Sequence, residues 1–451
     1  MTGTTKKFFR GAALTLLSAS ALVGIQAGAA SAMTLEEAVQ ITIRSNPAMV
    51  EARANYRAIT KELSQARSRY LPQLDIEVAY GPEYSDNPRT RDRTEFVTGL
   101  DGPGVWENRF ESGFVLSETL FDGFERRWEV RRQKARVNSA DSRIGDRAER
   151  LALDVVRAYL ESLRRAQILA LANGNLQAHG QILNDVRQLV SAGQSSVSDQ
   201  QQAEARYASA QVAVTQALRD LDESRITFAR LVGQYPDSLN APTFDGSLMS
   251  GSAEEAVEIA VTRSPLVLFA RADANAAFAA SKGAEARFFP QISVELRGSS
   301  NENIDGVRGD NEDFAAMVRM RYNLYRGGGD RARIQEAKER HSESLAVIAK
   351  LQRDIEEETR QSWSLMVRKD RETTDRQAAV TANEQVVRSY QQEFQIGRRD
   401  LLDLLDSENQ LFLSEVDLAT AQTDALFARY RVLASVGRLT AAMGVTSYFA
   451  E

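Results

Sequence analysis

The chain carries one segment twice, as Arg69-Tyr-Leu-Pro-Gln-Leu-Asp-Ile-Glu77 and, 218 positions later, as Arg287-Phe-Phe-Pro-Gln-Ile-Ser-Val-Glu295. Around this segment, residues 34–80 match residues 252–298 without a gap. Further along, at an offset of 204, Thr119-Leu-Phe-Asp-Gly123 matches Asn323-Leu-Tyr-Arg-Gly327. Two tandem copies of one motif predict a protomer with internal pseudo-twofold symmetry.

Directly after the proline of each segment, apolar and polar residues alternate. The apolar positions are Leu74, Ile76, Val78 and Tyr80 in the first copy and Ile292, Val294 and Leu296 in the second. A period of two predicts strands with one apolar and one polar face, at about 72–82 and 290–298. We expect return strands at about 109–120 and 313–324, and an irregular, Gly- and Pro-rich loop between Tyr80 and Arg109. Runs of about 9 to 11 residues can cross a bilayer as tilted strands, although a soluble hairpin is the alternative for any single run.

Two very long helices are predicted at about 124–192 and 330–396, where proline is absent and glycine is scarce. Their apolar residues recur at helical spacing among many charges, which favours coiled-coil packing. Each helix should end at a glycine suited to a left-handed cap, Gly193 or Gly397, before a second helix returns at about 198–232 or 401–443. The structural repeats are thus predicted as 33–233 and 252–443, with a linker at 234–251 and a tail at 444–451.

The N-terminus has the order of a secretory signal peptide: Lys6, Lys7 and Arg10, an apolar run, then Ala30-Ser31-Ala32. We expect cleavage after residue 32. Removing three positive charges would make a chain of net charge −6 still more acidic, which disfavours nucleic-acid binding. The chain has no cysteine, so an exported protein of this sequence must be held together by packing and assembly rather than by disulfides.

The predicted strands leave a sheet with two open edges. In hydrocarbon every backbone donor and acceptor must be satisfied, so such a sheet requires strands from other copies of the chain. Four strands are too few to close a barrel, which predicts a ring of protomers. The same symmetry would arrange the helices as a tube, and a hollow wall with a polar inner face conducts solutes.

Four motifs have the order found in one known family. They are Tyr70-Leu-Pro-Gln73, Phe289-Pro-Gln291, Leu120-Phe-Asp-Gly123 and Gly397-Arg-Arg-Asp-Leu-Leu-Asp-Leu-Leu-Asp-Ser-Glu-Asn-Gln-Leu-Phe412. Together with the signal peptide and the duplicated layout, they resemble the TolC family of outer-membrane efflux and secretion channels. The resemblance implies a mainly α-helical fold with a β-barrel part: a homotrimer with a twelve-stranded transmembrane barrel in outer-membrane lipid, above a periplasmic helical tunnel. It also implies two partners, a periplasmic adaptor (membrane fusion) protein and an inner-membrane transporter of the ABC or RND type.

The family's tunnel narrows at an Asp-x-x-Asp pair, which Asp403 and Asp406 match. Three residues apart on a helix, both carboxylates point to one face. In a threefold ring they would form stacked acidic triads that attract cations and raise each other's pKa. Local helix chemistry is the alternative, with Asp400 as N-cap and Asp403 as an acidic residue of the first turn.

The resemblance also implies a latch. An arginine four positions before the first gate aspartate ties the closed hairpins together in the family, and Arg399 occupies that position. Its partner there is an aspartate that matches Asp199. Where relatives carry a tyrosine in this network the chain has Phe394, so one hydroxyl-mediated bond is missing and the latch is expected to be looser.

We therefore predict an outer-membrane channel that passively conducts proteins in type I secretion. Small-molecule efflux is the alternative within the family. A periplasmic coiled-coil adaptor is the alternative from another class, but adaptors have one helical hairpin, whereas this chain has two hairpins and four strands. No catalytic, cofactor or metal site is expected, and an enzyme on a helical scaffold would have no candidate site. His179 and His341, the only histidines, lie in polar helices where we expect exposure to solvent.

Overall fold

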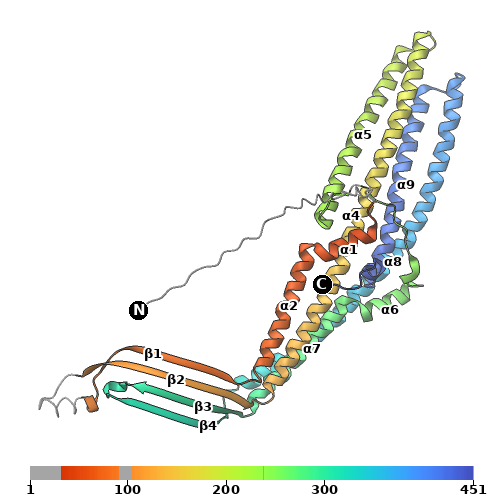
Figure 1. Ribbon diagram of the computed structural model, residues 1–451. Coiled ribbons are helices and arrows are strands. Elements are labelled where there is room, and N and C mark those ends of the chain that lie inside the picture. Colours follow the sequence, from red (N-terminus) through yellow and green to blue (C-terminus); the bar gives the residue numbers. More distant parts are fainter. Residues whose placement is uncertain (1–31, 91–103, 237, 450–451) are drawn as a thin grey trace, which may run out of the picture.

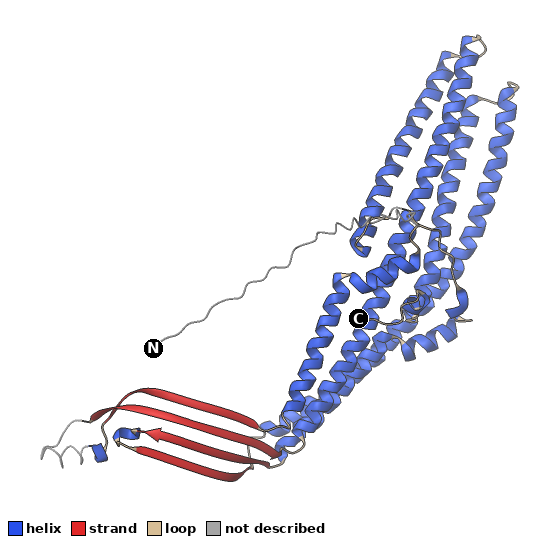
Figure 2. Ribbon diagram, in the orientation of Figure 1, coloured by secondary structure: helices blue, strands red, loops and turns tan. Residues whose placement is uncertain are grey.

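A computed structural model describes residues 32–90, 104–236 and 238–449 and shows an elongated molecule (Figure 1). A sheet lies at one end, and long helices run from it to the other end (Figure 2). The predicted signal peptide lies outside the described residues, apart from Ala32. Within the described ranges, no helix combines the length and apolar character needed to span a membrane.

The described residues form one sheet of four antiparallel strands in the order β1-β2-β3-β4. The strands are β1 (Gln73–Ser85), β2 (Val105–Phe121), β3 (Gln291–Glu302) and β4 (Asp310–Arg321). The first hairpin is longer than the sequence predicts, because pairing continues to Ser85 and Val105 through part of the predicted loop. Residues 91–103 of that loop lie outside the described residues. In β4 the strand ends at Arg321 rather than at residue 324.

The register places apolar side chains of all four strands on one face. Ile76 pairs with Phe114, which pairs with Gly298, which in turn pairs with Phe314. Ile76 is 74% exposed and Phe314 71% exposed, so the apolar face is uncovered in the single chain. The adjacent row of paired residues belongs to the opposite, polar face. It consists of Glu77, Gly113, Ser299 and Asp313. β1 and β4 are the two edges of this sheet, and each leaves one row of backbone groups open.

A pair of short helices precedes each strand hairpin. The sequence pattern predicts no helix in these segments. The pairs are α1 (Leu35–Ser45) with α2 (Pro47–Ser68), and α6 (Ala253–Arg263) with α7 (Pro265–Ala284). The repeat explains their matching ends: Thr34 and Ser252 each cap the first helix through a side-chain oxygen, and Pro47 and Pro265 each begin the second.

The long hairpins consist of α4 (Glu125–Ser191) with α5 (Val197–Val232), and α8 (Gly329–Gln395) with α9 (Leu401–Ser435). Both α4 and α8 have 67 residues, a length of about 100 Å. Their C-terminal glycines take the same left-handed geometry, with φ +67° at Gly193 and +73° at Gly397. The prediction of one helix from 401 to 443 is wrong, because Gly437 takes φ +71° and ends α9 early. A separate turn of helix, α10 (Leu439–Ala442), follows.

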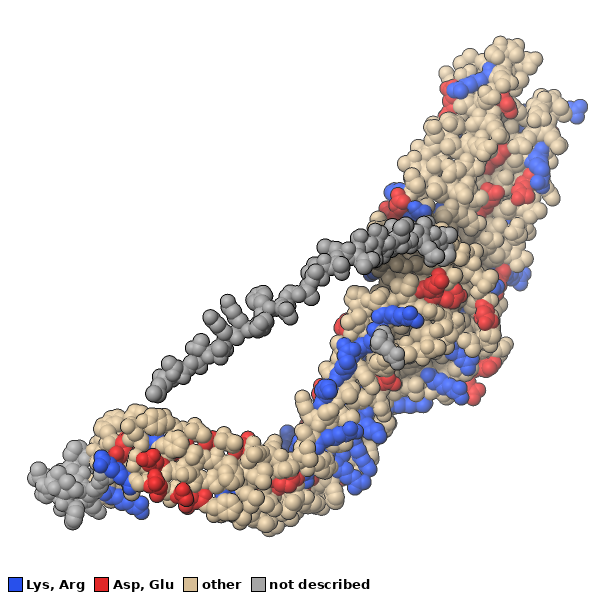
Figure 3. Space-filling model, viewed as in Figure 1, with Lys and Arg blue, Asp and Glu red and all other residues tan. Residues whose placement is uncertain are grey.

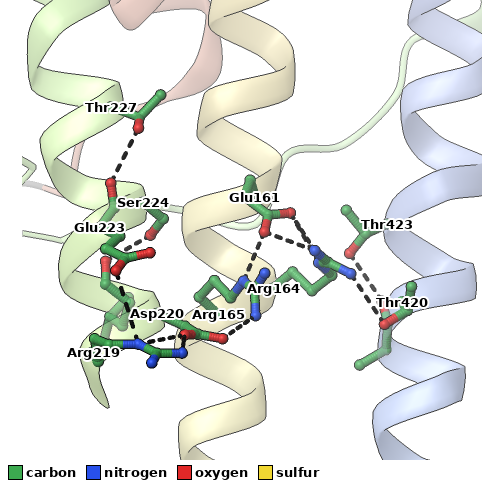
Figure 4. A network of polar contacts seen from close by, with 12 residues as sticks. Glu161, Arg164, Arg165, Arg219, Asp220, Glu223, Ser224, Thr227, Thr420 and Thr423 are labelled. Carbon is green, nitrogen blue, oxygen red and sulfur yellow. Dashed lines mark hydrogen bonds and ion pairs between the residues drawn. The ribbon is translucent and has the colours of Figure 1, made fainter. Parts of the chain in front are cut away.

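Polar contacts join the first hairpin to α9 in the middle of the bundle (Figure 4). Arg165 of α4 lies 2.6 Å from Asp220 of α5, and Arg164 donates to the Thr420 hydroxyl of α9 across 3.3 Å. Glu161 accepts hydrogen bonds from both arginines. Two guanidinium groups, two carboxylates and one hydroxyl therefore connect the three helices.

The C-terminal segment is fastened to α4 by a buried acid. Glu149, 5% exposed, accepts hydrogen bonds from the Leu439 and Thr440 amides at 3.0 and 3.1 Å and from the Thr440 hydroxyl at 2.5 Å. The Tyr448 hydroxyl lies 2.9 Å from that of Thr440. This region adjoins the largest apolar core, whose buried members include Val39, Met49, Val155, Tyr159, Phe228 and Leu433.

Candidate functional site: the tips of the helical hairpins

A small apolar core joins the two hairpins near the ends farthest from the sheet. Its buried residues come from α4, α5 and α9: Ile182, Leu183, Val186, Ala203, Leu401, Leu404 and Leu405. Tyr390 and Phe394 of α8 pack against it. Phe394, where the latch network of relatives has a tyrosine, therefore contributes apolar packing in this chain.

The two predicted gate residues lie in the first two turns of α9, near this core. Asp400 accepts a hydrogen bond from the Leu402 amide at 3.0 Å and is the N-cap, with Asp403 in the first turn. Asp406, one turn later, accepts from Arg206 of α5 across 2.5 Å. This ion pair connects the two hairpins within one protomer, and it partly neutralises one carboxylate of the predicted gate.

The predicted latch arginine is engaged within its own hairpin. Arg399 contacts Glu393 at 2.7 Å and Asp403 at 3.2 Å, and its guanidinium lies 4.1 Å from the centre of the Tyr390 ring. Hydrogen bonding to Glu393, and then to Asp403, raises the pKa of this guanidinium. Arg399 thus holds the end of α8 to the start of α9.

Asp199, the predicted partner in the latch, occupies the other hairpin tip. Its carboxylate accepts from the Ser195 hydroxyl at 2.7 Å and from the Ser196 amide at 3.0 Å, and the Ser196 hydroxyl caps α5 in return. These hydrogen bonds lower the pKa of the Asp199 carboxyl. Among the described residues no ion pair joins Asp199 to Arg399, so each residue serves its own hairpin in the single chain.

The expectation that His179 is exposed is wrong. His179 is 2% exposed on α4, and burial, together with the charge of Arg206, lowers its pKa. Its position explains the burial: it precedes Ile182, Leu183 and Val186 by three, four and seven residues, so it shares their helix face. The other histidine, His341, is half-buried with its ring 5.4 Å from that of Phe278. In the described ranges no cluster of carboxylates or histidines could hold a metal ion.

Sequence reasoning missed Arg206 and Glu393. One signal could have found Arg206: it stands three residues after Ala203 and four before Ala210, so it lies on the face of α5 that carries these two buried alanines. Glu393 had no signal beyond its place six residues before Arg399. Arg206 gives Asp406 a cationic partner, whereas Glu393 shares Arg399 with Asp403.

Comparison with known proteins agrees with this architecture. A sequence profile of the Outer membrane efflux protein family matches residues 38–234 and 256–438, one match for each structural repeat. The chain belongs to this family. Its members are outer-membrane channels rather than enzymes, and they are trimers that work with periplasmic adaptors and inner-membrane transporters. The protein is accordingly an outer-membrane protein whose helices extend into the periplasm.

Individual relatives extend over nearly the whole chain. The outer membrane efflux protein BepC of Brucella suis is 26% identical over 95% of this chain and 90% of its own. The proteases secretion protein PrtF of Dickeya chrysanthemi is 24% identical over 88% of this chain and 86% of its own. The open-state structure of the MtrE outer membrane channel of Neisseria gonorrhoeae superposes with a TM-score of 0.75 at 18% identity, over 90% of this chain and 89% of that one. The protomer therefore has the fold of these channels.

Proposed function

We propose that three copies of this chain form one channel, with a closed twelve-stranded barrel in the outer membrane, that passively conducts proteins in type I secretion. The observation that carries the channel assignment is the sheet: its apolar face is uncovered, and both edge strands are open. Only strand pairing between protomers satisfies these edges in lipid. The periplasmic partners in this proposal are an adaptor docked near the far ends of the hairpins and an inner-membrane transporter of the ABC or RND type.

Secretion and drug efflux differ in the molecule that the channel conducts, a protein or a small compound, and this difference can be tested. The similarity to PrtF supports secretion, and the similarity to BepC supports efflux as the second candidate. Deletion of the gene should abolish export of a protein that an ABC transporter secretes, while leaving susceptibility to dyes and detergents unchanged. Hypersusceptibility with intact secretion would favour efflux. Finding the protein as a soluble periplasmic monomer, rather than a heat-modifiable outer-membrane trimer, would contradict the channel itself.

We also propose that Asp403 and Asp406 form the periplasmic gate. In a threefold ring their carboxylates would be repeated around the pore axis, where like charges attract cations and repel anions. The pairing of Asp406 with Arg206 supports a second role, since this ion pair would hold α5 and α9 together at the constriction. The gate would then carry negative charge, and the ion pair between α5 and α9 would also stabilise its position.

Replacing Asp403 and Asp406 together with alanine should lower cation selectivity. The pore would lose six carboxylates per trimer and leave Arg206 unpaired, so both changes shift selectivity toward anions. Reversal potentials in planar bilayers under a salt gradient measure this shift. The control is Asp222→Ala with Asp375→Ala, which removes two exposed carboxylates elsewhere on the hairpins. An unchanged reversal potential in the gate variant would remove the assignment.

The latch proposal places Arg399 against Asp199 of a neighbouring protomer in the closed channel. Arg399→Ser should raise the closed-state conductance, and Asp199→Asn should do the same because it weakens the opposite charge. Combining the two changes should add little to either one, since both break one contact. Glu393→Gln is the control, as it removes one of the contacts of Arg399 within its own hairpin without removing either latch residue. Additive effects, or no rise with Arg399→Ser, would count against the latch.

A further inference from the structure

The apolar face of the sheet continues onto one face of α4. Phe121 pairs with Ile292, which pairs with Met320, so Phe121 belongs to the apolar row of the sheet. The Phe124 ring lies 5.5 Å from the Phe121 ring, at the first residue before α4. The side of α4 near Phe124 is therefore the side that continues the lipid-facing surface.

On that side of α4, exposed cations follow at helical spacing. Arg127, Arg131 and Lys134 are separated by four and three residues, which places them on one face together with Phe124. Glu125 and Glu129 lie about 180° away around the helix. Glu125 lines a cavity of about 800 Å³ whose strand residues come from both faces, with Ser117 and Glu295 from the polar face and Ile292 and Met320 from the apolar face. The cations thus lie on the opposite side of α4 from Glu125 and point away from this cavity.

The second copy places cations at the same positions. At the offset of 204 that relates α4 to α8, Arg127 matches Arg331 and Lys134 matches Lys338, and all four side chains are exposed. We call these four residues the basic belt. Figure 3 shows Lys and Arg gathered over the part of the helical bundle that adjoins the sheet.

Among the residues that the structure describes, the basic belt has no counter-ion. None of its four residues forms an ion pair with another described residue, whereas most arginines further along the helices do. Arg127 and Arg331 are the third residues of their helices, where the helix dipole disfavours a positive charge. These two arginines have no carboxylate partner and lie at the helix end where a positive charge is disfavoured. We infer that an anion outside the chain provides the missing partner.

We propose that the basic belt binds the anionic phospholipid headgroups of the periplasmic leaflet of the outer membrane. The belt begins where the apolar strands end and extends about 10 Å along the helices, and long basic side chains can reach back toward the headgroups. In a trimer the Arg–Lys pair of the belt occurs six times around the channel, twice in each chain. It fixes the depth of the barrel in the membrane at the end that joins the tunnel. This inference depends on the sheet lying in lipid and is independent of the gate, the latch and the cargo.

Titration of the purified full-length trimer in detergent with fluorescent phosphatidylglycerol tests the proposal. Each basic residue near an anionic surface contributes about fivefold to binding. The variant R127Q/K134Q/R331Q/K338Q should therefore weaken binding at least tenfold and lose most of its salt dependence. The control R147Q/K350Q/R353Q/R371Q makes the same change of net charge at exposed positions further from the sheet and should bind as the unmodified protein does.

Three results would overturn the proposal. Equal weakening in both variants would mean that net charge alone attracts the lipid, and equal binding in the belt variant would mean that the belt is not the site. A belt variant that is monomeric in size-exclusion chromatography before lipid is added would show that the belt is a contact between protomers. Labelled phosphatidylcholine should bind both variants and the unmodified protein alike.

Discussion

Replacing Glu149 with alanine is expected to lower the free energy of unfolding by about 3 to 5 kcal/mol, because two buried backbone amides and a hydroxyl would lose their acceptor. The amides belong to Leu439 and Thr440, at the start of the turn that follows Gly437. Amide hydrogen exchange measures the effect where it arises, as faster exchange at residues 439 and 440, and circular dichroism follows the loss of global stability. Glu149→Gln keeps an acceptor and should cost less. Unchanged exchange in the alanine variant would show that the acid does not hold the C-terminal segment.

The same residue should make stability depend on pH. Burial raises the pKa of Glu149 to about 7, despite the three hydrogen bonds that act in the opposite direction. The folded chain therefore binds this proton more tightly than the unfolded chain, whose carboxyl has its ordinary value of 4.5. The stability from this group is complete below about pH 4.5 and is lost as the pH rises through about 7, a difference of about 3 kcal/mol. Between pH 5 and 8 Glu149→Gln should flatten this slope, and an equally steep slope would contradict the assignment.

Much of the fold can be predicted from the sequence because its signals are local. A period of two after Pro72 and Pro290 predicts the inner parts of the strands, and absence of proline predicts the long helices. The outer ends of β1 and β2 could not be predicted. Pro82 and the charges around it interrupt the alternation, and only pairing across the hairpin, up to Ser85 with Val105, reveals strand structure there.

The contacts of the tip residues and of Glu149 cannot be predicted from local sequence patterns. Asp406 and Arg206 are 200 residues apart, and Glu149 meets Leu439 across 290 residues, so no window of sequence contains both partners. Glu149 looks like one more charge on a polar helix. The burial of His179 escapes prediction for a related reason: a single polar residue gives no sign of burial unless the apolar positions that share its helix face are considered with it.

The orientation of the sheet can be tested with two adjacent alanines of β4. Ala316 lies in the apolar row with Leu296 and Leu116, near the middle of the sheet, whereas Ala315 faces the opposite side beside Arg297. An arginine at a lipid-facing position near the midplane costs about 2 to 4 kcal/mol, and a trimer would contain three of them. Ala316→Arg should therefore nearly abolish the heat-modifiable trimer in outer-membrane fractions.

Ala315→Arg is the matched control, since it places the same side chain one residue away on the polar face. Its cost should stay within about 1 kcal/mol, because the only new disadvantage is a like charge beside Arg297 in a hydrated lumen. The trimer band and its urea resistance compare the two variants directly. Because a shift of one residue exchanges the two faces of a strand, the difference between them depends on which face meets lipid. Equal tolerance of both arginines would mean that neither face is in hydrocarbon, and the inference that the open edges pair between protomers would lose its basis.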